Sequence, residues 1–126
     1  NVVLEAASLW TEGARVRLSR TLDFPLDAAE PTPASAPALD QIARWLADHP
    51  DIHLVRVEGH ADAFGPSAYN YALSLRRAEA VVADLTRRGL PAGRISAVGR
   101  GEASPIASNA DETGRSLNRR VEVHCD

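Results

Sequence analysis

Apolar residues recur along the chain with two different periods, and these periods predict the order of its elements. Residues 14 to 24 alternate between apolar and polar side chains, which predicts one or two short strands. Apolar residues then recur at helical spacing from Ala36 to Asp48, and Pro50 ends this segment. Alternation returns from Ile52 to His60. The first half of the chain therefore predicts a strand region, a helix and a further strand.

The second half of the chain repeats this change of period. An apolar stripe over residues 67 to 88 predicts a long helix, which Gly89 closes. Arg94 to Gly99 is predicted as a strand, Gly99 to Gly114 as a loop and Arg119 to Cys125 as the last strand. The order β-α-β-α-β-loop-β is typical of an α/β (α+β) fold, a two-layer sandwich of one mixed sheet with its helices on one face.

Two of the predicted strands have one apolar and one polar face. Valines occupy alternate positions in both strands, and charged side chains or histidines occupy the positions between them. The apolar set is Val55, Val57, Val121 and Val123, and the polar set is Arg56, Glu58, His60, Glu122 and His124. Helices that cover one face of a sheet leave the other in contact with water, so we expect the polar face to be solvated.

The length and charge of the chain limit the classes of protein to which it can belong. A chain of 126 residues suffices for one domain, and we assign residues 1–21 to an N-terminal extension or strand and residues 22–126 to the domain. A formal charge of -3 argues against nucleic acid as a partner, since domains that bind it usually present a net basic face. The single cysteine, Cys125, excludes an intrachain disulfide and a cluster of thiolate metal ligands.

Targeting and membrane segments are not evident in the sequence. It contains no run of eighteen apolar residues, so we expect no segment to span a bilayer. It carries no charged-then-apolar signal peptide and opens on Asn1. We therefore expect an excised domain or a processed product whose targeting or anchoring segments lie elsewhere.

Two opposite charges, Asp62 and Arg77, lie fifteen residues apart around the predicted turn from strand to helix. Asn70 precedes Arg77 by seven residues, which places both on one line of the helix. A carboxylate and a guanidinium fixed at one end of a sheet can together hold a zwitterion. Without a ligand, the same two groups are expected to pair with each other, and an exposed pair of this kind contributes only about 0 to 1 kcal/mol.

A larger set of residues surrounds these charges at fixed spacings. It comprises Gly59-His60-Ala61-Asp62, Gly65, Tyr69-Asn70, Leu73-Ser74, Arg77-Ala78, Gly99, Gly101-Glu102, Pro105, Asn109, Gly114-Arg115 and Asn118-Arg119-Arg120-Val121-Glu122. This pattern resembles the OmpA C-terminal-like peptidoglycan-binding family and covers roughly residues 22 to 124. Phe24, Asp27, Ala29, Pro33 and Ser35 also resemble the opening segment of that family.

The resemblance implies a module that binds peptidoglycan without catalysis, through the diaminopimelate residue of the stem peptide. It implies that Asp62 receives the ammonium group of the ligand and Arg77 its carboxylate, while Asn70 supports the ligand and Arg119 is a second arginine at the same mouth. It also implies a protein of the periplasm, associated with the outer membrane or cell wall and tethered to a membrane by segments outside this chain. The tethered part would be an outer-membrane barrel, a lipoprotein anchor or an inner-membrane motor stator. The oligomeric state is left open.

Two positions depart from the pattern of the family. Ala61 stands where the family commonly has threonine, and Pro25 stands where it often has Asp or Asn. The first change removes one hydroxyl near the ligand. We expect such changes to affect the affinity or the preference for amidated or unamidated walls, while the two principal charges remain.

Other kinds of site are less well supported by the residues. One strand carries three possible metal ligands at alternate positions, Glu58, His60 and Asp62. Such side chains on a solvated face usually bind no metal ion, so we expect no metal and no cofactor. No nucleophile with a base beside it is evident, so we expect no enzyme activity, and a wall hydrolase is the least favoured alternative. The main alternative is an OmpA-like protein-interaction module that has lost wall binding and uses the polar sheet face as its contact.

Overall fold

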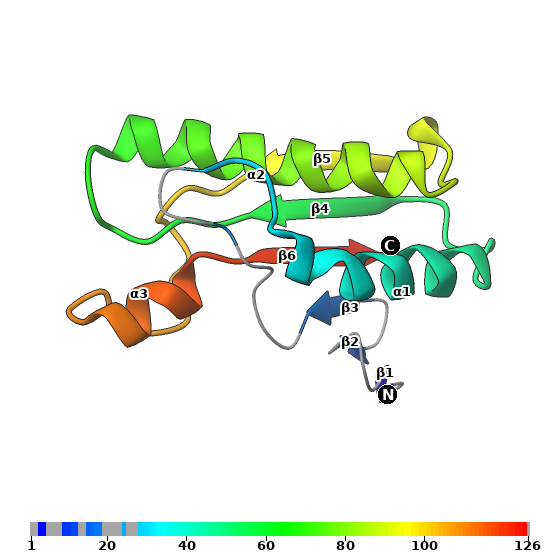
Figure 1. Ribbon diagram of the computed structural model, residues 1–126, viewed down its shortest axis with the longest axis horizontal. Helices are drawn as coiled ribbons and strands as arrows, with labels where there is room; N and C mark the ends of the chain where they lie inside the picture. The colour runs from blue at the N-terminus through cyan, green and yellow to red at the C-terminus, as the bar shows by residue number, and fades with distance from the viewer. Residues whose placement is uncertain (1–2, 5–8, 13–14, 19–23, 25–27, 126) are drawn as a thin grey trace.

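The computed structural model describes residues 3–4, 9–12, 15–18, 24 and 28–125. After the N-terminal strands, two long helices alternate with three strands, and a short helix precedes the last strand (Figure 1). These elements are α1 (Ala36–Ala47), β4 (Val55–Gly59), α2 (Ser67–Arg87), β5 (Ile95–Gly99), α3 (Glu112–Asn118) and β6 (Val121–Cys125), with 3-10 turns η1 (Pro33–Ser35) and η2 (Ala92–Arg94). The two long helices and three strands were predicted to within a few residues.

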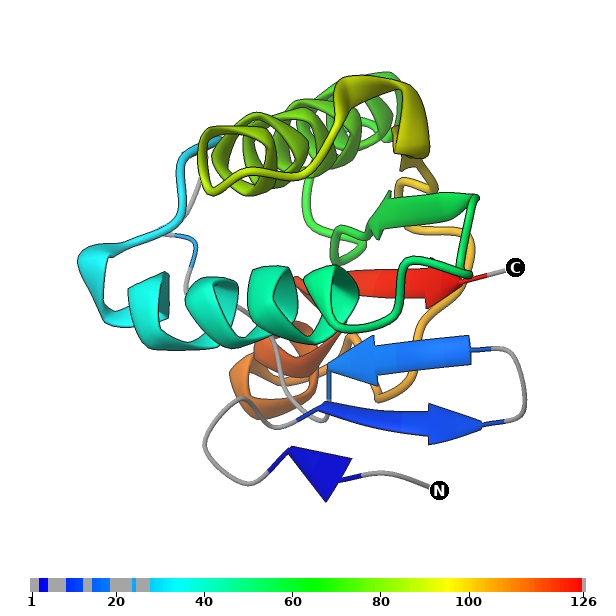
Figure 2. The ribbon, with the colours of Figure 1, turned by 90° about the vertical axis from the view of Figure 1, so that its right-hand side faces the viewer.

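The central sheet has the order β5-β4-β6. Strand β4 pairs in parallel with β5 and antiparallel with β6, so the sheet is mixed. Figure 2 shows α1 and α2 on the same side of this sheet. The predicted fold class, α+β with one mixed sheet and helices on one face, is therefore confirmed.

Three further strands precede this unit. The strands β1 (Val3–Leu4), β2 (Leu9–Glu12) and β3 (Arg15–Leu18) form an antiparallel sheet in the order β1-β2-β3. Strand β3 lies beside β6 and falls within the region where the sequence predicted one or two strands. The proposed division at residue 22 stays a prediction, because residues 19–23 lie outside the described part of the chain.

The segment between β5 and β6 was predicted as a loop up to Gly114, but its last part is helical. Asp111 caps the N-terminus of α3 by accepting a hydrogen bond of 2.7 Å from the backbone N–H of Gly114. A side chain at position 114 would collide with the carbonyl oxygen of Ser108. The glycine that suggested a loop is thus required for close packing of the helix against the preceding chain.

The apolar core lies between the helices and the sheet. The valines of β4 and β6 are at most 2% exposed and pack against Ile42 and Leu46 of α1 and Val81 and Leu85 of α2. This confirms the apolar face predicted from the alternation. None of the helices in the described part of the chain combines the length and hydropathy needed to cross a bilayer.

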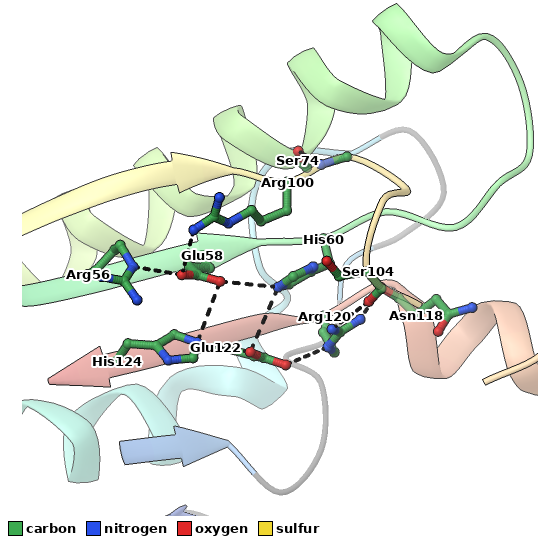
Figure 3. Close-up of polar contacts among 11 residues, drawn as sticks. Arg56, Glu58, His60, Ser74, Arg100, Ser104, Asn118, Arg120, Glu122 and His124 are labelled. Atoms are coloured by element: carbon green, nitrogen blue, oxygen red, sulfur yellow. Dashed lines mark hydrogen bonds and ion pairs between the residues drawn. The ribbon is translucent and has the colours of Figure 1, made fainter. Parts of the chain in front are cut away.

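The polar face of the sheet was predicted to be solvated, and this prediction was wrong. Glu58, His60, Glu122 and His124, which we call the polar cluster, are only 3–7% exposed. The antiparallel register places Glu58 opposite Glu122, so the two strands concentrate their polar side chains in one patch. Three arginines hydrogen-bond to this patch and help to cover it (Figure 3). They are Arg56, Arg100 and Arg120.

A candidate ligand-binding pocket at the end of the sheet

A pocket of about 410 Å³ lies where β4 ends and α2 begins. All four residues predicted to bind a ligand line it, although they come from three separate parts of the sequence. They are Asp62, Asn70, Arg77 and Arg119. The rest of the lining consists of Ala61, Phe64, Gly65, Pro66, Tyr69 and Leu73, and we call this cavity the end pocket.

Glycine at the end of β4 allows the strand and the helix to approach each other at the end pocket. A Cβ atom on Gly59 would collide with the carbonyl oxygen of Ser74 in α2. The chain after the strand is then fixed on both sides, because the N–H of His60 donates to Arg120 O and the N–H of Ala61 donates to Gly101 O, each at 2.8 Å. Asp62 therefore follows a segment that is bonded to the chain after β5 and the chain before β6.

The carboxylate of Asp62 is 5% exposed and has two partners. Its Oδ1 accepts a hydrogen bond of 3.0 Å from the N–H of Phe64, and its Oδ2 lies 2.7 Å from Nη1 of Arg119. The sequence suggested that Asp62 pairs with Arg77 in the absence of a ligand. In the structure its ion pair is with Arg119, because the turn into β6 brings that residue to the same mouth.

Arg119 bridges two carboxylates. Besides Asp62, it donates to Glu112 of α3, at 2.8 Å from Nη2 and 3.3 Å from Nη1. The hydrogen bond from Arg119 is also the main reason why the pKa of Glu112 lies below its usual value. Glu112 was not predicted as a part of this site, since it lies in the unpredicted helix α3. Its role is to orient the guanidinium of Arg119.

Arg77 reaches the end pocket from the middle of α2 and is 1% exposed. Its Nε donates a hydrogen bond of 2.9 Å to the carbonyl oxygen of Ala28, and its guanidinium carbon lies 5.1 Å from the ring centroid of Phe24. A guanidinium over an aromatic face is a favourable cation–π contact. Arg77 therefore also holds the segment that precedes α1, a contact between distant parts of the chain that spacing alone did not indicate.

Asn70 is buried on the first turns of α2 and fixes the loops around the end pocket. Its Nδ2 donates to the carbonyl oxygen of Gly65 at 3.4 Å and to Oε1 of Glu102 at 3.2 Å. Gly65 has a φ of +94°, a conformation that favours glycine, in the turn before the helix. Asn70 thus connects this turn to the loop after β5.

Exposed aromatic side chains lie at the rim of the end pocket, and one of the two departures from the family pattern lies in its wall. Phe64 is 62% exposed at the rim of the end pocket, and Tyr69 beside it is partly exposed. Ala61 is buried in the pocket wall, so its missing hydroxyl concerns the site directly. Pro25, the other departure, lies outside the described residues.

The comparison with known families agrees with the fold. Residues 24–119 match the family model described as the OmpA family, and the chain belongs to this family. The chain is 43% identical over 108 residues to outer membrane porin F of Pseudomonas fluorescens, covering 86% of this chain and 33% of the porin. It is 40% identical over 100 residues to the peptidoglycan-binding protein ArfA of Mycobacterium tuberculosis, covering 79% of this chain and 30% of ArfA. The chain thus spans about a third of the length of these two relatives.

A solved structure shares the arrangement of helices and strands. The crystal structure of the peptidoglycan-associated lipoprotein from Burkholderia pseudomallei superposes with a TM-score of 0.78 at 32% identity, covering 85% of this chain and 90% of that one. The names of these three relatives place them in the outer membrane, among lipoproteins or in contact with peptidoglycan. The chain is therefore an OmpA-like domain with relatives that bind peptidoglycan.

Proposed function

We propose that this domain binds peptidoglycan without catalysis, through the diaminopimelate residue of the stem peptide, and so anchors an envelope protein to the cell wall. The observation that supports this most strongly is that Asp62, Asn70, Arg77 and Arg119 line one pocket. A zwitterionic amino-acid group needs an anion and a cation within a few ångströms of one carbon atom. The end pocket supplies both.

The ammonium group of the ligand is assigned to Asp62. A carboxylate can accept about four hydrogen bonds, and Asp62 uses one on Phe64 and one on Arg119. The ammonium can therefore join these partners without displacing them. Because Asp62 is buried, its charge is only weakly screened by salt, which favours binding of a cationic group.

The carboxylate of the ligand is assigned to the arginines. A guanidinium can bind a carboxylate through two parallel hydrogen bonds. Arg77 is held by Ala28 and Phe24, and Arg119 by Glu112, so neither has to be ordered when the ligand arrives. The N-terminus of α2 begins beside Pro66 at the pocket wall and adds a partial positive charge.

The location of the domain follows from the same proposal. Wall binding requires the domain to lie in the periplasm, associated with the outer membrane or cell wall. We propose that a membrane tether outside this chain completes the anchor, as the names of the porin and lipoprotein relatives suggest. The protein-interaction alternative relied on a solvated polar sheet face, and the burial of the polar cluster removes that support.

A sedimentation assay with Asp62→Asn tests the proposal. We expect the purified domain to co-sediment with insoluble peptidoglycan that contains diaminopimelate, and to be released by free diaminopimelate. Asp62→Asn leaves the ligand ammonium without its charged partner, which costs about 2 to 5 kcal/mol, or at least about a thirtyfold loss of affinity. A matched control is Asp40→Asn, which removes another ion-paired aspartate near the far end of α2 and is expected to change nothing.

Peptidoglycan that carries lysine in place of diaminopimelate distinguishes binding to the wall in general from recognition of diaminopimelate. Lysine lacks the second carboxylate, so we expect little binding to this wall. Equal binding to both walls would keep wall binding but refute recognition of diaminopimelate. Failure to bind either wall, or an effect of Asp62→Asn below twofold, would refute the assignment of the end pocket. Soluble fragments released from the wall would instead indicate a hydrolase.

A further inference from the structure

The polar cluster on the face of the sheet away from the helices contains a set of groups that the end pocket does not use. Strand pairing brings Glu58 and His60 of the β4 segment next to Glu122 of β6. One ligand atom from each of these three side chains lies within 4.8 Å of the others, and all three side chains are buried. The alternation along the strand grouped Glu58 and His60 with Asp62 as possible metal ligands. In the structure Asp62 lies in the end pocket instead, and the third side chain beside Glu58 and His60 is Glu122.

The imidazole of His60 is the clearest sign that this cluster receives a ligand. His60 is 3% exposed, and neither of its ring nitrogens makes a hydrogen bond with any group in the described part of the chain. Leaving a buried polar group without a hydrogen bond costs about 1 to 3 kcal/mol. Its Nε2 faces Oε1 of Glu58 and Oε1 of Glu122, at 3.8 Å from each (Figure 3).

These distances suit a metal ion bound between the three groups better than a direct hydrogen bond. Two ligands that are each about 2.1 Å from a tetrahedral zinc ion lie about 3.4 Å apart. A separation of 3.8 Å is too long for a hydrogen bond and close to this value. We propose that Glu58, His60 and Glu122 bind a Zn²⁺ ion, with water completing the coordination.

The neighbouring side chains orient these ligands as the outer partners of metal sites do. Arg56 and Arg100 donate to Oε2 of Glu58, at 2.6 and 3.1 Å. Arg120 donates to Oε2 of Glu122 at 2.8 Å. Carboxylate ligands of metals are commonly held by such second partners. The Oε1 atoms of both carboxylates face His60, and they also face Nε2 of His124, at 2.9 Å from Glu122 and 3.5 Å from Glu58, so a bound ion would replace this contact.

The protonation states agree with this assignment. Burial of His60, followed by the charge of Arg120, lowers its pKa to about 4, so the ring is neutral at physiological pH. Burial opposes ionisation of Glu58, but hydrogen bonds from Arg100 and Arg56 outweigh it and lower the pKa of Glu58 to about 2. Metal ions bind neutral imidazole and ionised carboxylates, so these ligands need not lose a proton first.

The charge around the cluster sets the expected strength of binding. Three guanidinium groups repel a cation, whereas zinc sites that stabilise folds commonly contain thiolates that attract it. We therefore expect weaker binding than at a structural zinc site. A cavity of about 410 Å³, lined by these residues and by the segment Ser104–Ile106, gives the ion a path from solvent.

Titration of the 126-residue chain with zinc chloride by isothermal calorimetry, after removal of metals with EDTA, tests the proposal. We expect one Zn²⁺ per chain and a higher melting temperature at saturating zinc. His60→Gln is expected to weaken binding at least tenfold. His53→Gln is the matched control, because it removes an exposed histidine ahead of β4, and it should leave binding unchanged.

Titration with cobalt chloride on the unmodified chain provides a second measurement that needs no variant. Co²⁺ in a four-coordinate site gives intense visible absorption bands, which zinc should then abolish. The absence of zinc binding by the unmodified chain would overturn the proposal, as would zinc binding that His60→Gln leaves unchanged. The test uses no cell wall, so its outcome is independent of the proposed function.

Discussion

The end pocket and the polar cluster both bring carboxylates together with arginines, but they differ in what surrounds the ion pairs. In the end pocket, Asp62 and Arg119 face a cavity whose rim carries the exposed ring of Phe64. In the polar cluster, Arg120 and Glu122 are paired with both side chains buried. Both pairs line cavities, but Arg119 keeps Glu112 as a second carboxylate partner when Asp62 takes up a ligand. Among the described residues Arg120 has Glu122 as its one carboxylate partner, so this pair mainly stabilises the strands. The comparison predicts that substitutions in the two regions affect different measurements.

The largest expected effect on stability is that of Glu122→Gln in the polar cluster. This change leaves the buried guanidinium of Arg120 without its charged partner, and breaking a buried pair in this way costs about 3 to 5 kcal/mol. Urea unfolding measures the loss. Wall binding by the folded fraction should be unchanged, since Glu122 does not line the end pocket.

The corresponding substitution in the end pocket is Asp62→Asn, which we expect to affect wall binding more than stability. The charge of Arg119 stays paired through its two hydrogen bonds to Glu112, so the loss of unfolding free energy should be smaller, about 1 to 3 kcal/mol, while wall binding is lost. If both variants lost stability equally, or if Glu122→Gln alone abolished wall binding, the distinction between the two regions would be wrong.

The pH dependence of stability gives a second contrast. Because the pKa of His60 falls to about 4 on folding, the unfolded chain binds more protons between pH 6.5 and 4, and the free energy of unfolding decreases as the pH falls through this range. The shift corresponds to about 3 kcal/mol. The ionised form of Glu58 contributes stability that is present above about pH 4.5 and lost as the pH falls toward 2.

Urea unfolding at several pH values with EDTA present measures this effect. The charged groups that act on His60 are Glu58 from β4, Arg100 after β5, and Arg120 and Glu122 from the β6 side. His60→Gln should flatten the curve between pH 6.5 and 4 and leave the decrease below pH 4 in place. A curve with the same slope in both proteins would assign the pH dependence to other groups.

The smallest predicted effect is a gain of affinity in the end pocket. Ala61→Thr restores the hydroxyl that is common in the family, and one additional hydrogen bond to the ligand contributes about 1 kcal/mol, or about fivefold in affinity. The sedimentation assay with diaminopimelate-containing wall measures it, and Ala61→Val is the control with the same shape but no hydroxyl. Equal affinity of the threonine and valine variants would place residue 61 out of reach of the ligand.

Much of the fold could be predicted from the sequence, because its elements have clear periods. The valines of β4 and β6 follow one period, and they are buried where that period places them. The length of α2 was also predicted, but its buried face includes Asn70, Ser74 and Arg77, whereas Tyr71 of the apolar stripe is 53% exposed. The helix α3 was missed because it has only seven residues and contains Gly114 and Asn118. Its signal was Asp111, a typical N-terminal cap three residues before Gly114.

Four residues of the end pocket, Asp62, Asn70, Arg77 and Arg119, were named from the family pattern, but Phe64 and Pro66 in its lining and the partners of the charged groups were not predicted. The contact of Arg119 with Glu112 and the contact of Arg77 with Ala28 could not be predicted from residue spacing, because each contact depends on how distant segments of the chain pack. The burial of the polar cluster was missed for the same reason. Alternation along β4 shows that Glu58 and His60 share a face, but only the register with β6 brings Glu122 to them.

The contacts of Arg77 have a mechanical consequence for an anchor. One guanidinium group lies in the wall of the end pocket and also grips the backbone at Ala28 and the ring of Phe24. Tension applied at Phe24 and Ala28 would therefore reach the side chain of Arg77 through an aromatic contact and a hydrogen bond. In the proposed wall anchor, the side chain assigned to the ligand carboxylate would thus also carry load from the segment ahead of α1.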